Sequence, residues 1–400
     1  MKQNPPNVGD IIEVTTDRLA FGGEAVARHD GLAIFVPLAV PGERLQVRIT
    51  ERKKNYARAA IENVIESSPD RRDPPCRYFG DCGGCQLQHM SYEMQLASKV
   101  RFVRDALERI ARIDWPDEIP IRHGPPFGYR ARAQIRIDQR TGRVGFNRTA
   151  SHSICDVVSC PILIPELDAA LSSLRAAVAG ANVNDRVVAG LRQIDVAAGE
   201  TGVSFEPALS NLASVPLRQT ASGAVYGFDP STFFQSNPAL LDVLIEEAVG
   251  GLSGEFAIDL YAGVGLFTIQ LARRFKRVIG VETDPRTAKH AIANIAANSA
   301  ANIEFRTSPA DSWLKGFKAS ASQSPDLLVL DPPRTGAAQA IPSIIELSPR
   351  SIAYVSCDPA TLARDLRALV DGGYTISRVT AIDLFPQTYH VETVALLNRR

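Results

Sequence analysis

Apolar and polar residues alternate along residues 8 to 66, in short runs separated by glycine-rich turns. Three such runs are DIIEVTTDRLAFGGEAVAR, GLAIFVPLAVPGERLQVRIT and YARAAIENVIE. A period of two is typical of strands with one buried face, and several short strands at this spacing favour a small barrel. We therefore predict a β-barrel domain over residues 1–68, ended by the turn-rich linker SSPDRRDPP.

The pattern changes from residue 238 onward, where short apolar strands alternate with amphipathic helices. The predicted strands are EFAIDL, RVIGVE, IEFRTS, DLLVLD and SIAYVS. This alternation is typical of a doubly wound parallel sheet with helices on both faces. YTISRVTAIDLF and HVETVALLNR then follow without a helix between them, which predicts a closing hairpin. We expect a Rossmann-like α/β domain over residues 238–400.

The intervening segment, residues 69–237, reads as a central α+β domain. It begins with a cysteine-bearing loop, continues with a helix predicted from about residue 91 to 113, and then becomes rich in strands. A chain of 400 residues is too long for one ordinary core, which agrees with a division into three domains.

Composition narrows the class of protein. The chain is 45% hydrophobic and 22% charged, close to the globular average, and no apolar run approaches the ~20 residues that span a bilayer. The start, MKQNPPNVGD, lacks the apolar core of a signal peptide. We expect a cytoplasmic protein without membrane contact, acting as a monomer, whose six cysteines are reduced.

Positive charge is concentrated in two runs, although the net charge is zero. Residues 44–58 hold six Lys or Arg against one acid, Glu51. Residues 122–148 hold seven Arg against one acid, Asp138. Either run alone is compatible with a solvated face, but two runs of one sign in the same half of the chain favour contact with a polyanion such as RNA.

Candidate cofactor residues follow the predicted strands. Gly263 and Gly265, in DLYAGVGLFTIQLA, allow a tight turn where a ligand can approach the backbone. Glu282 ends the next strand, 23 residues after Asp259, where a carboxylate can accept hydrogen bonds from both ribose hydroxyls. Asp331 ends the fourth strand, before two stiffening prolines. A single βαβ half without a third glycine favours S-adenosylmethionine over a dinucleotide.

A candidate nucleophile, Cys357, ends the fifth strand and faces the same crevice as Asp331. A free cysteine is most often a small buried hydrophobe. However, the helix predicted from about Ala360 would stabilise a thiolate through its N-terminal dipole, relative to an ordinary pKa of roughly 8.5. Glu392 interrupts an apolar run in the last strand, so we expect its side chain to point to a specific partner.

The other cysteines form a candidate metal site. Cys76, Cys82 and Cys85 are spaced C-x5-C-x2-C, and the fourth ligand has to come from Cys155 or Cys160. The proline after Cys160 favours it, because proline often follows the last ligand in iron-sulfur proteins. Zinc also accepts four thiolates, but three clustered cysteines with one remote cysteine suit a cubane cluster.

Five motifs in this order resemble those of the S-adenosylmethionine-dependent RNA uracil-5 methyltransferases: STFFQSNPALLDVL, DLYAGVGLF, LDPPRTG, SCDPATLARDL and FPQTYHVETVALL. The resemblance extends to residues 8–66, which look like the family's RNA-binding TRAM barrel, a domain similar to the OB fold. It covers nearly the whole chain.

The resemblance implies residue roles. Cys357 would be the nucleophile and Glu392 the base, with cofactor contacts from Gln235, Tyr261, Glu282 and Asp331. It also implies a 4Fe-4S cluster at the four cysteines. Two positions depart from the family pattern. Leu266 stands where many members have Asn, so no contact is assigned there. Asp358 stands where Asn is common, and a carboxylate there would raise the thiol pKa.

Two other functions are compatible with parts of the chain. An amino-group methyltransferase could use the Asp-Pro-Pro motif, but that chemistry has no use for Cys357. A non-catalytic RNA-binding or assembly protein would not need Cys357 and Glu392 together. For the RNA itself, the barrel and cluster favour 23S ribosomal RNA by analogy, with transfer RNA as the alternative.

Overall fold

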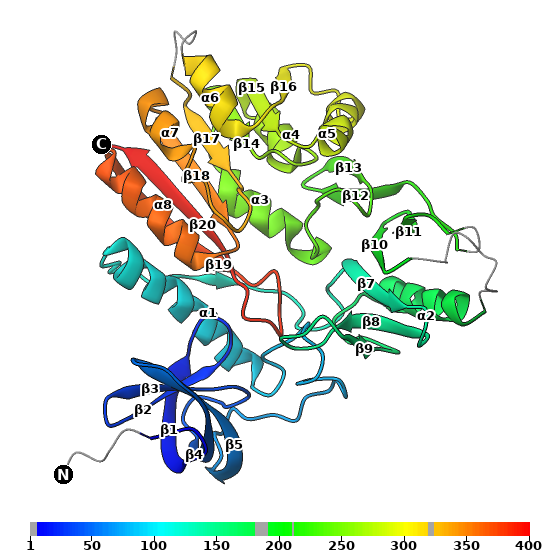
Figure 1. Ribbon diagram of the computed structural model, residues 1–400. Coiled ribbons are helices and arrows are strands. Elements are labelled where there is room, and N and C mark those ends of the chain that lie inside the picture. Colours follow the sequence, from blue (N-terminus) through cyan, green and yellow to red (C-terminus); the bar gives the residue numbers. More distant parts are fainter. Residues whose placement is uncertain (1–5, 181–190, 210–211, 319–323) are drawn as a thin grey trace.

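The computed structural model describes residues 6–180, 191–209, 212–318 and 324–400. Its first five strands close into a barrel in the order β1-β2-β3-β5-β4, near the N-terminus in Figure 1. They are β1 (Ile11–Leu19), β2 (Ala25–His29), β3 (Leu32–Val36), β4 (Arg44–Arg52) and β5 (Tyr56–Glu66). The predicted barrel is confirmed.

The alternating pattern is what closes this barrel. Along β4, Leu45, Val47 and Ile49 are buried in the barrel core. Arg44 and Arg48, on the other face of the same strand, are exposed. Because successive side chains of a strand point to opposite faces, one apolar interior and one charged exterior follow from the sequence.

The helix predicted near residues 91–113 is α1 (Tyr92–Ala106), which continues into a π-helical turn at Leu107–Ala111. Ser91 caps its start, since the Ser91 side chain accepts a hydrogen bond from the backbone N–H of Met94. After α1 the short strand β6 (Ile121–Arg122) pairs in parallel with β19, a strand near the C-terminus. The middle of the chain therefore contributes an edge strand to the C-terminal sheet.

A second sheet of five antiparallel strands has the order β11-β10-β7-β8-β9. Its strands are β7 (Arg132–Asp138), β8 (Arg143–Asn147), β9 (Ile154–Asp156), β10 (Gln193–Gly199) and β11 (Gly202–Glu206). Helix α2 (Pro165–Gly180), which the pattern analysis did not predict, packs on one face through Leu167, Leu171 and Leu174. A hairpin, β12 (Leu217–Ala221) and β13 (Ala224–Phe228), follows.

The third sheet has eight strands in the order β16-β15-β14-β17-β18-β20-β19-β6. The five strands β14 to β18 are parallel, as predicted, and β19 and β20 form the closing antiparallel hairpin. The strands are β14 (Gly254–Leu260), β15 (Phe275–Glu282), β16 (Ile303–Thr307), β17 (Leu327–Leu330), β18 (Ser351–Ser356), β19 (Tyr374–Ile382) and β20 (Glu392–Arg399).

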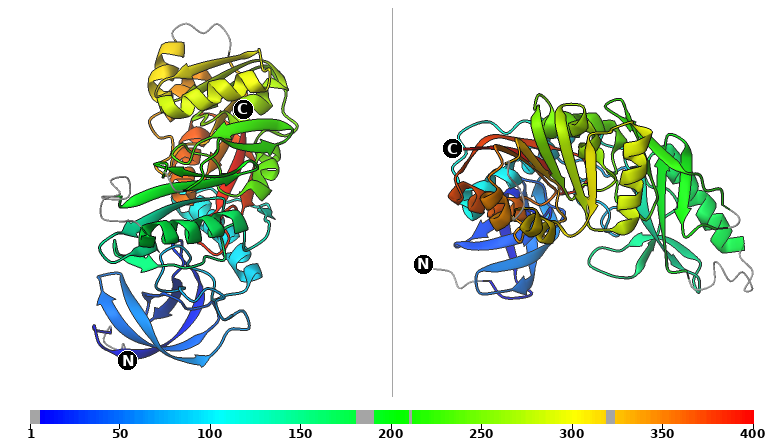
Figure 2. Two further views of the ribbon diagram at one scale, coloured as in Figure 1. Left: turned by 90° about the vertical axis from the view of Figure 1, so that its right-hand side faces the viewer. Right: turned by 90° about the horizontal axis from the view of Figure 1, so that it is seen from above.

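Helices cover both faces of this sheet, which makes it a three-layer α/β structure. One face carries α1, α6 (Ala310–Lys318), α7 (Ile341–Leu347) and α8 (Pro359–Asp371). The other carries α3 (Leu241–Val249), which follows a 3-10 turn at Pro238–Leu240, together with α4 (Leu266–Ala272) and α5 (Pro285–Ala297). In the left view of Figure 2 the barrel lies at one end of the molecule and this layered part at the other.

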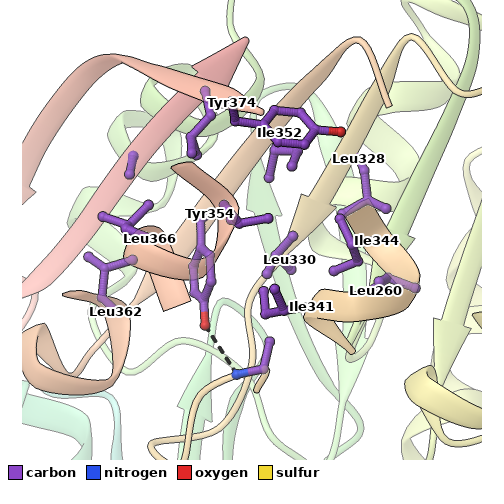
Figure 3. Packing of buried hydrophobic residues seen from close by; sticks show 14 of the residues in the cluster. Leu260, Leu328, Leu330, Ile341, Ile344, Ile352, Tyr354, Leu362, Leu366 and Tyr374 are labelled. Carbon is purple, nitrogen blue, oxygen red and sulfur yellow. Dashed lines mark hydrogen bonds between the residues drawn. The ribbon is translucent and has the colours of Figure 1, made fainter. Parts of the chain in front are cut away.

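Successive residues along each strand point to opposite faces of the sheet. Leu328 and Leu330 of β17 belong to the core on the α7 and α8 side, whereas Leu327 and Val329 belong to the core on the α3 and α4 side. Figure 3 shows the first of these cores, where the Tyr354 hydroxyl also accepts a hydrogen bond from the backbone N–H of Ala337 at 3.2 Å. Apolar residues on both faces explain why these strands read as continuous apolar runs.

Candidate active site

Three predicted residues meet at one edge of the C-terminal sheet. β17 and β18 are parallel neighbours, so Asp331 after β17 and Cys357 after β18 lie at the same carboxyl edge. β20 runs antiparallel to β18 with Ser356 opposite Thr393. Glu392, the first residue of β20, therefore lies beside Cys357, and the register of one strand pair brings the two together.

Glu392 is buried, with 3% of its surface exposed. Within the described part of the chain its Oε1 has no hydrogen-bond partner. Burial and the nearby Asp331 carboxylate raise the pKa of Glu392 well above its ordinary value. A carboxyl group in this environment binds a proton more strongly than a solvated one does, which suits a proton acceptor.

Cys357 is half-buried beside three charged groups. Burial raises the pKa of its thiol to about 12, Glu392 and Asp331 act in the same direction, and Arg334 opposes them. The expectation of a lowered pKa is wrong, because desolvation and the two acids raise it. Near neutral pH the thiol is therefore protonated, and it has to lose this proton before the sulfur attacks.

Asp358 has a local role next to the thiol. It is the N-cap of α8, and its Oδ1 accepts hydrogen bonds from the backbone N–H groups of Ala360 at 3.0 Å and Thr361 at 2.9 Å. Asp and Asn cap helices about equally well, which accounts for an acid at this position. The carboxylate also satisfies first-turn N–H groups that carry the positive end of the dipole.

The glycine turn has an unusual backbone. Tyr261, Gly263 and Gly265 have φ values of +60°, +57° and +93°, and the value for Tyr261 is costly because this residue has a Cβ. A Cβ built on Gly263 would meet no atom within 4 Å, so space is open beside the turn. Glu282 ties the turn to β15, since its Oε2 accepts a hydrogen bond from the Gly263 N–H at 2.9 Å.

Gln235 reaches the same edge of the sheet from the loop after β13. Its side chain is buried, and Nε2 donates to Asp331 Oδ2 at 3.4 Å. Arg132 holds the preceding loop, because its guanidinium donates to the carbonyl oxygens of Thr232 and, at 2.9 Å, Pro230. Burial raises the pKa of Asp331 to about 7. Gln235 and Asp331 therefore form a polar pair next to the glycine turn.

Asp259 is a site residue that the sequence interpretation used only as a landmark. It is fully buried, its Oδ2 accepts from the Thr268 hydroxyl at 2.5 Å, and its Oδ1 has no partner in the described residues. Burial raises its pKa to about 7, and Asp331 and Glu282 contribute to this rise. The sequence alone could have identified Asp259 as a site residue, since an acid within an apolar strand, just before a glycine turn, is rarely buried for packing alone.

Arg334 and His390 were also missed. The Arg334 guanidinium lies 3.2 Å from His390 Nε2 and lowers the pKa of Cys357. Burial, with help from Arg334, lowers the pKa of His390 to about 4, so the ring is neutral near pH 7. Arg334 belongs to the same LDPPRTG loop as Asp331, and that loop position was the available signal.

The cysteines predicted as metal ligands meet at a second place. Cys76, Cys82, Cys85 and Cys160 line one cavity of about 550 Å³. Cys155 does not line it; this buried thiol donates to Asp81 Oδ2 at 3.5 Å. In the described segments no three His, Cys, Asp or Glu side chains are arranged to hold a metal ion.

Within the described ranges, none of the helices has both the length and the apolar character needed to cross a bilayer.

Comparison with known proteins identifies families and relatives that match this chain. Residues 214–400 match the model of the tRNA (uracil-5-)-methyltransferase family, and residues 5–61 match the TRAM domain. An uncharacterized RNA methyltransferase of Halalkalibacterium halodurans is 35% identical, with 99% of this chain and 98% of that protein covered. The 23S rRNA (uracil(1939)-C(5))-methyltransferase of Klebsiella pneumoniae is 33% identical, with 98% and 96% covered.

A solved structure has the same fold. The tRNA (uracil-54, C5)-methyltransferase of Pyrococcus abyssi, in complex with S-adenosyl-L-homocysteine, superposes with a TM-score of 0.73 at 24% identity, and covers 96% of this chain and all of that one. Family match, relatives and fold agree over nearly the full length. The chain belongs to the RNA uracil-5 methyltransferase family.

Proposed function

We propose that this protein methylates carbon 5 of a uridine in RNA, with Cys357 as nucleophile and Glu392 as base. The observation that carries the proposal is the β18–β20 register, which sets the thiol beside a buried carboxyl group with an unpartnered oxygen. An amino-group methyltransferase needs neither group, and a non-catalytic RNA-binding protein has no reason to keep an acid buried at a cost in stability.

Carbon 5 of uracil is a poor nucleophile, so the reaction needs covalent help. The Cys357 sulfur adds to carbon 6, which leaves an enolate with electron density at carbon 5. Carbon 5 then takes the methyl group, Glu392 removes the proton from carbon 5, and the carbon–sulfur bond breaks to release the thiolate. Arg334, the cation nearest the thiol, favours the thiolate before attack and after release.

The residues around the glycine turn fit S-adenosylmethionine, which supplies the electrophilic methyl group when bound. Gly263 leaves open space beside the backbone, and Glu282 keeps one lone pair on Oε2 for a ribose hydroxyl after it accepts three backbone N–H groups. Gln235, Asp331 and Tyr261 line the neighbouring edge. The unpartnered Asp259 Oδ1 marks a buried acceptor that lacks a donor within the described chain.

For the substrate we propose 23S ribosomal RNA in the cytoplasm, with the protein acting as a monomer. Relatives that match this chain over 96% of their own length are named for that specificity. The Pyrococcus abyssi tRNA enzyme supports the fold alone. The test is methyl transfer from labelled S-adenosylmethionine to purified 23S rRNA and tRNA from cells that lack the protein. Incorporation into tRNA only would redirect the proposal, and incorporation into neither would refute it.

We further propose that Cys76, Cys82, Cys85 and Cys160 hold a 4Fe-4S cluster. The four thiols line one cavity, and three cysteines close in sequence with one remote cysteine suit a cubane cluster. Methyl transfer is not a redox reaction, so the cluster would stabilise this segment of the chain or position the RNA.

A further inference from the structure

The two basic runs differ in how their charges are compensated. In the barrel, arginines pair with glutamates at N···O distances of 2.7 to 3.1 Å; the pairs are Arg44–Glu66, Arg48–Glu62 and Arg58–Glu24. Lys53 likewise pairs with Glu51 at 3.1 Å. Most of the positive charge predicted to face a polyanion from this run is therefore neutralised within the barrel.

Part of the second run has structural partners and part has none. Arg122 pairs with Glu247 and Arg148 with Asp81, while Arg132 holds the loop before Gln235. Arg136 and Arg140, by contrast, form no ion pair within 4.0 Å with any described residue. A guanidinium without a carboxylate partner is available to an external anion.

Arg136 lies on the face of the five-stranded sheet opposite α2. In β7, Ala133, Ile135 and Ile137 belong to the core under α2. Alternation along the strand turns Gln134 and Arg136 to the other face. Figure 1 shows α2 beside the strands β7 and β8.

A groove of about 600 Å³ opens on this second face. Arg136, Arg140 and Arg192 line it, together with Asn147 and His152. Arg192 directly precedes β10, far along the chain, and it has no ion-pair partner within 4.0 Å among the described residues. Three guanidinium groups thus line one groove, although only Arg136 and Arg140 belong to the basic run at residues 122–148.

One acid, Asp138, also lines the groove, but it is engaged in the hairpin turn. Its Oδ2 accepts from the Thr141 hydroxyl at 2.7 Å and its Oδ1 accepts from the Arg140 backbone N–H at 3.0 Å. The Arg140 side chain takes no part in this bond. The groove therefore keeps an excess of positive charge.

The groove adjoins the cysteine cavity, because Asn147 and His152 line both. Arg130 also lines that cavity, and its neighbour Tyr129 donates a hydrogen bond to the Pro386 carbonyl at 2.9 Å. Pro386 belongs to the loop 383–391, which leads directly into Glu392. The groove is thus contiguous with the cysteine cavity, and a buried hydrogen bond connects the residue beside Arg130 to the loop that leads to Glu392.

We infer that this groove binds backbone phosphates of the RNA substrate, at nucleotides that flank the target uridine. The inference rests on the proposed function, since it takes RNA as the substrate. Planar guanidinium groups match phosphate oxygens with two parallel hydrogen bonds, and Asn147 adds a neutral donor. No aromatic ring is needed, because phosphate contacts position a strand without reading its bases.

The test compares two variants that lose the same charge. The groove variant carries Arg136→Gln, Arg140→Gln and Arg192→Gln; the control carries Arg44→Gln, Arg48→Gln and Arg58→Gln on the barrel. Binding of a 23S rRNA fragment is measured from 50 to 200 mM salt. If each groove arginine contacts one phosphate, the log-log slope falls by roughly 2 to 3 in the groove variant only. The apparent KM for RNA rises, while kcat at saturation stays unchanged.

An equal slope in the groove variant and the wild type would overturn the inference, as would an equal loss in the control. A double variant, Arg140→Gln with Arg192→Gln, guards against misfolding, since both side chains are exposed. It should lose roughly 1.4 to 1.8 from the slope. If RNA binding by the wild type depends steeply on salt but no methyl group is transferred, the proposed function is refuted, while the inference that the groove binds phosphates is still supported.

Discussion

Gln95 and Gln387 hold each other through two hydrogen bonds across 292 residues of sequence. Gln95 Nε2 donates to Gln387 Oε1 at 3.0 Å, and the Gln387 backbone N–H donates to Gln95 Oε1 at 3.1 Å. The Gln387 carbonyl also accepts from Gln86 and Leu87, which follow the cysteine motif. Helix α1 and the cysteine segment therefore clamp the loop that positions Glu392.

Gln95→Leu should weaken this clamp. Leaving buried acceptors and donors unsatisfied costs about 1 to 3 kcal/mol in the free energy of unfolding. Turnover should fall as well, because Glu392 follows the loosened loop. Urea denaturation and kcat measure the two effects. Gln219→Leu, which removes an exposed amide, is the control and should change neither quantity. Unaltered turnover in Gln95→Leu would show that the clamp does not position the base.

Cys357→Ala and Glu392→Gln should fail at different steps. Without the thiol no covalent bond to RNA forms, so methyl transfer is lost while affinity for S-adenosylmethionine stays nearly unchanged. Without the carboxylate, addition and methylation proceed but removal of the carbon 5 proton slows by roughly 10² to 10⁴. A protein–RNA adduct should accumulate on a denaturing gel with Glu392→Gln only. Wild-type turnover by Cys357→Ala would rule out the nucleophile.

The rate should increase with pH. The reactive form of Cys357 is its thiolate, and a pKa of about 12 leaves little of it near neutrality. Glu392, whose pKa is also raised, must likewise be ionised to accept a proton. Both groups become active by losing a proton, so single-turnover methylation should rise between pH 7 and 9, by up to about tenfold per pH unit for each group that titrates in this range. A flat profile would contradict these assignments.

Arg334 provides a check on the origin of that pH profile. Removing its charge with Arg334→Ala should raise the pKa of Cys357 further and slow the reaction by a similar factor at pH 7 and at pH 9, because both lie far below that pKa. Arg334→Lys keeps the charge and should keep most of the rate. If Arg334→Lys slows the reaction as much as Arg334→Ala does, Arg334 acts by contact and not through its charge on the thiol.

Metal content tests the cysteine assignment. Protein purified without oxygen should be brown with about four irons per chain. Cys160→Ser should bleach it and Cys155→Ser should not, because only the first of these thiols lines the cavity. Stoichiometric zinc in the anaerobic protein would exclude the cluster.

Strand-end residues were predictable from the chain alone. In a parallel sheet the carboxyl ends of all strands meet at one edge, so Glu282, Asp331 and Cys357 could be assigned to one crevice from the order of the strands. The closed barrel followed from period-two alternation for a similar reason. The helix α2 could have been found too, since Leu167, Leu171 and Leu174 recur at helical spacing after Pro165.

Properties that depend on distant neighbours required the folded chain. The pKa of Cys357 depends on Glu392 and Asp331, which approach it only through strand pairing, so the local dipole argument predicted the wrong direction. The basic runs likewise showed where arginines are and not which are neutralised. Arg192 joins Arg136 because β10 pairs with β7, and no local pattern records that pairing. Electrostatic energies depend on spatial distance and burial, and sequence separation measures neither.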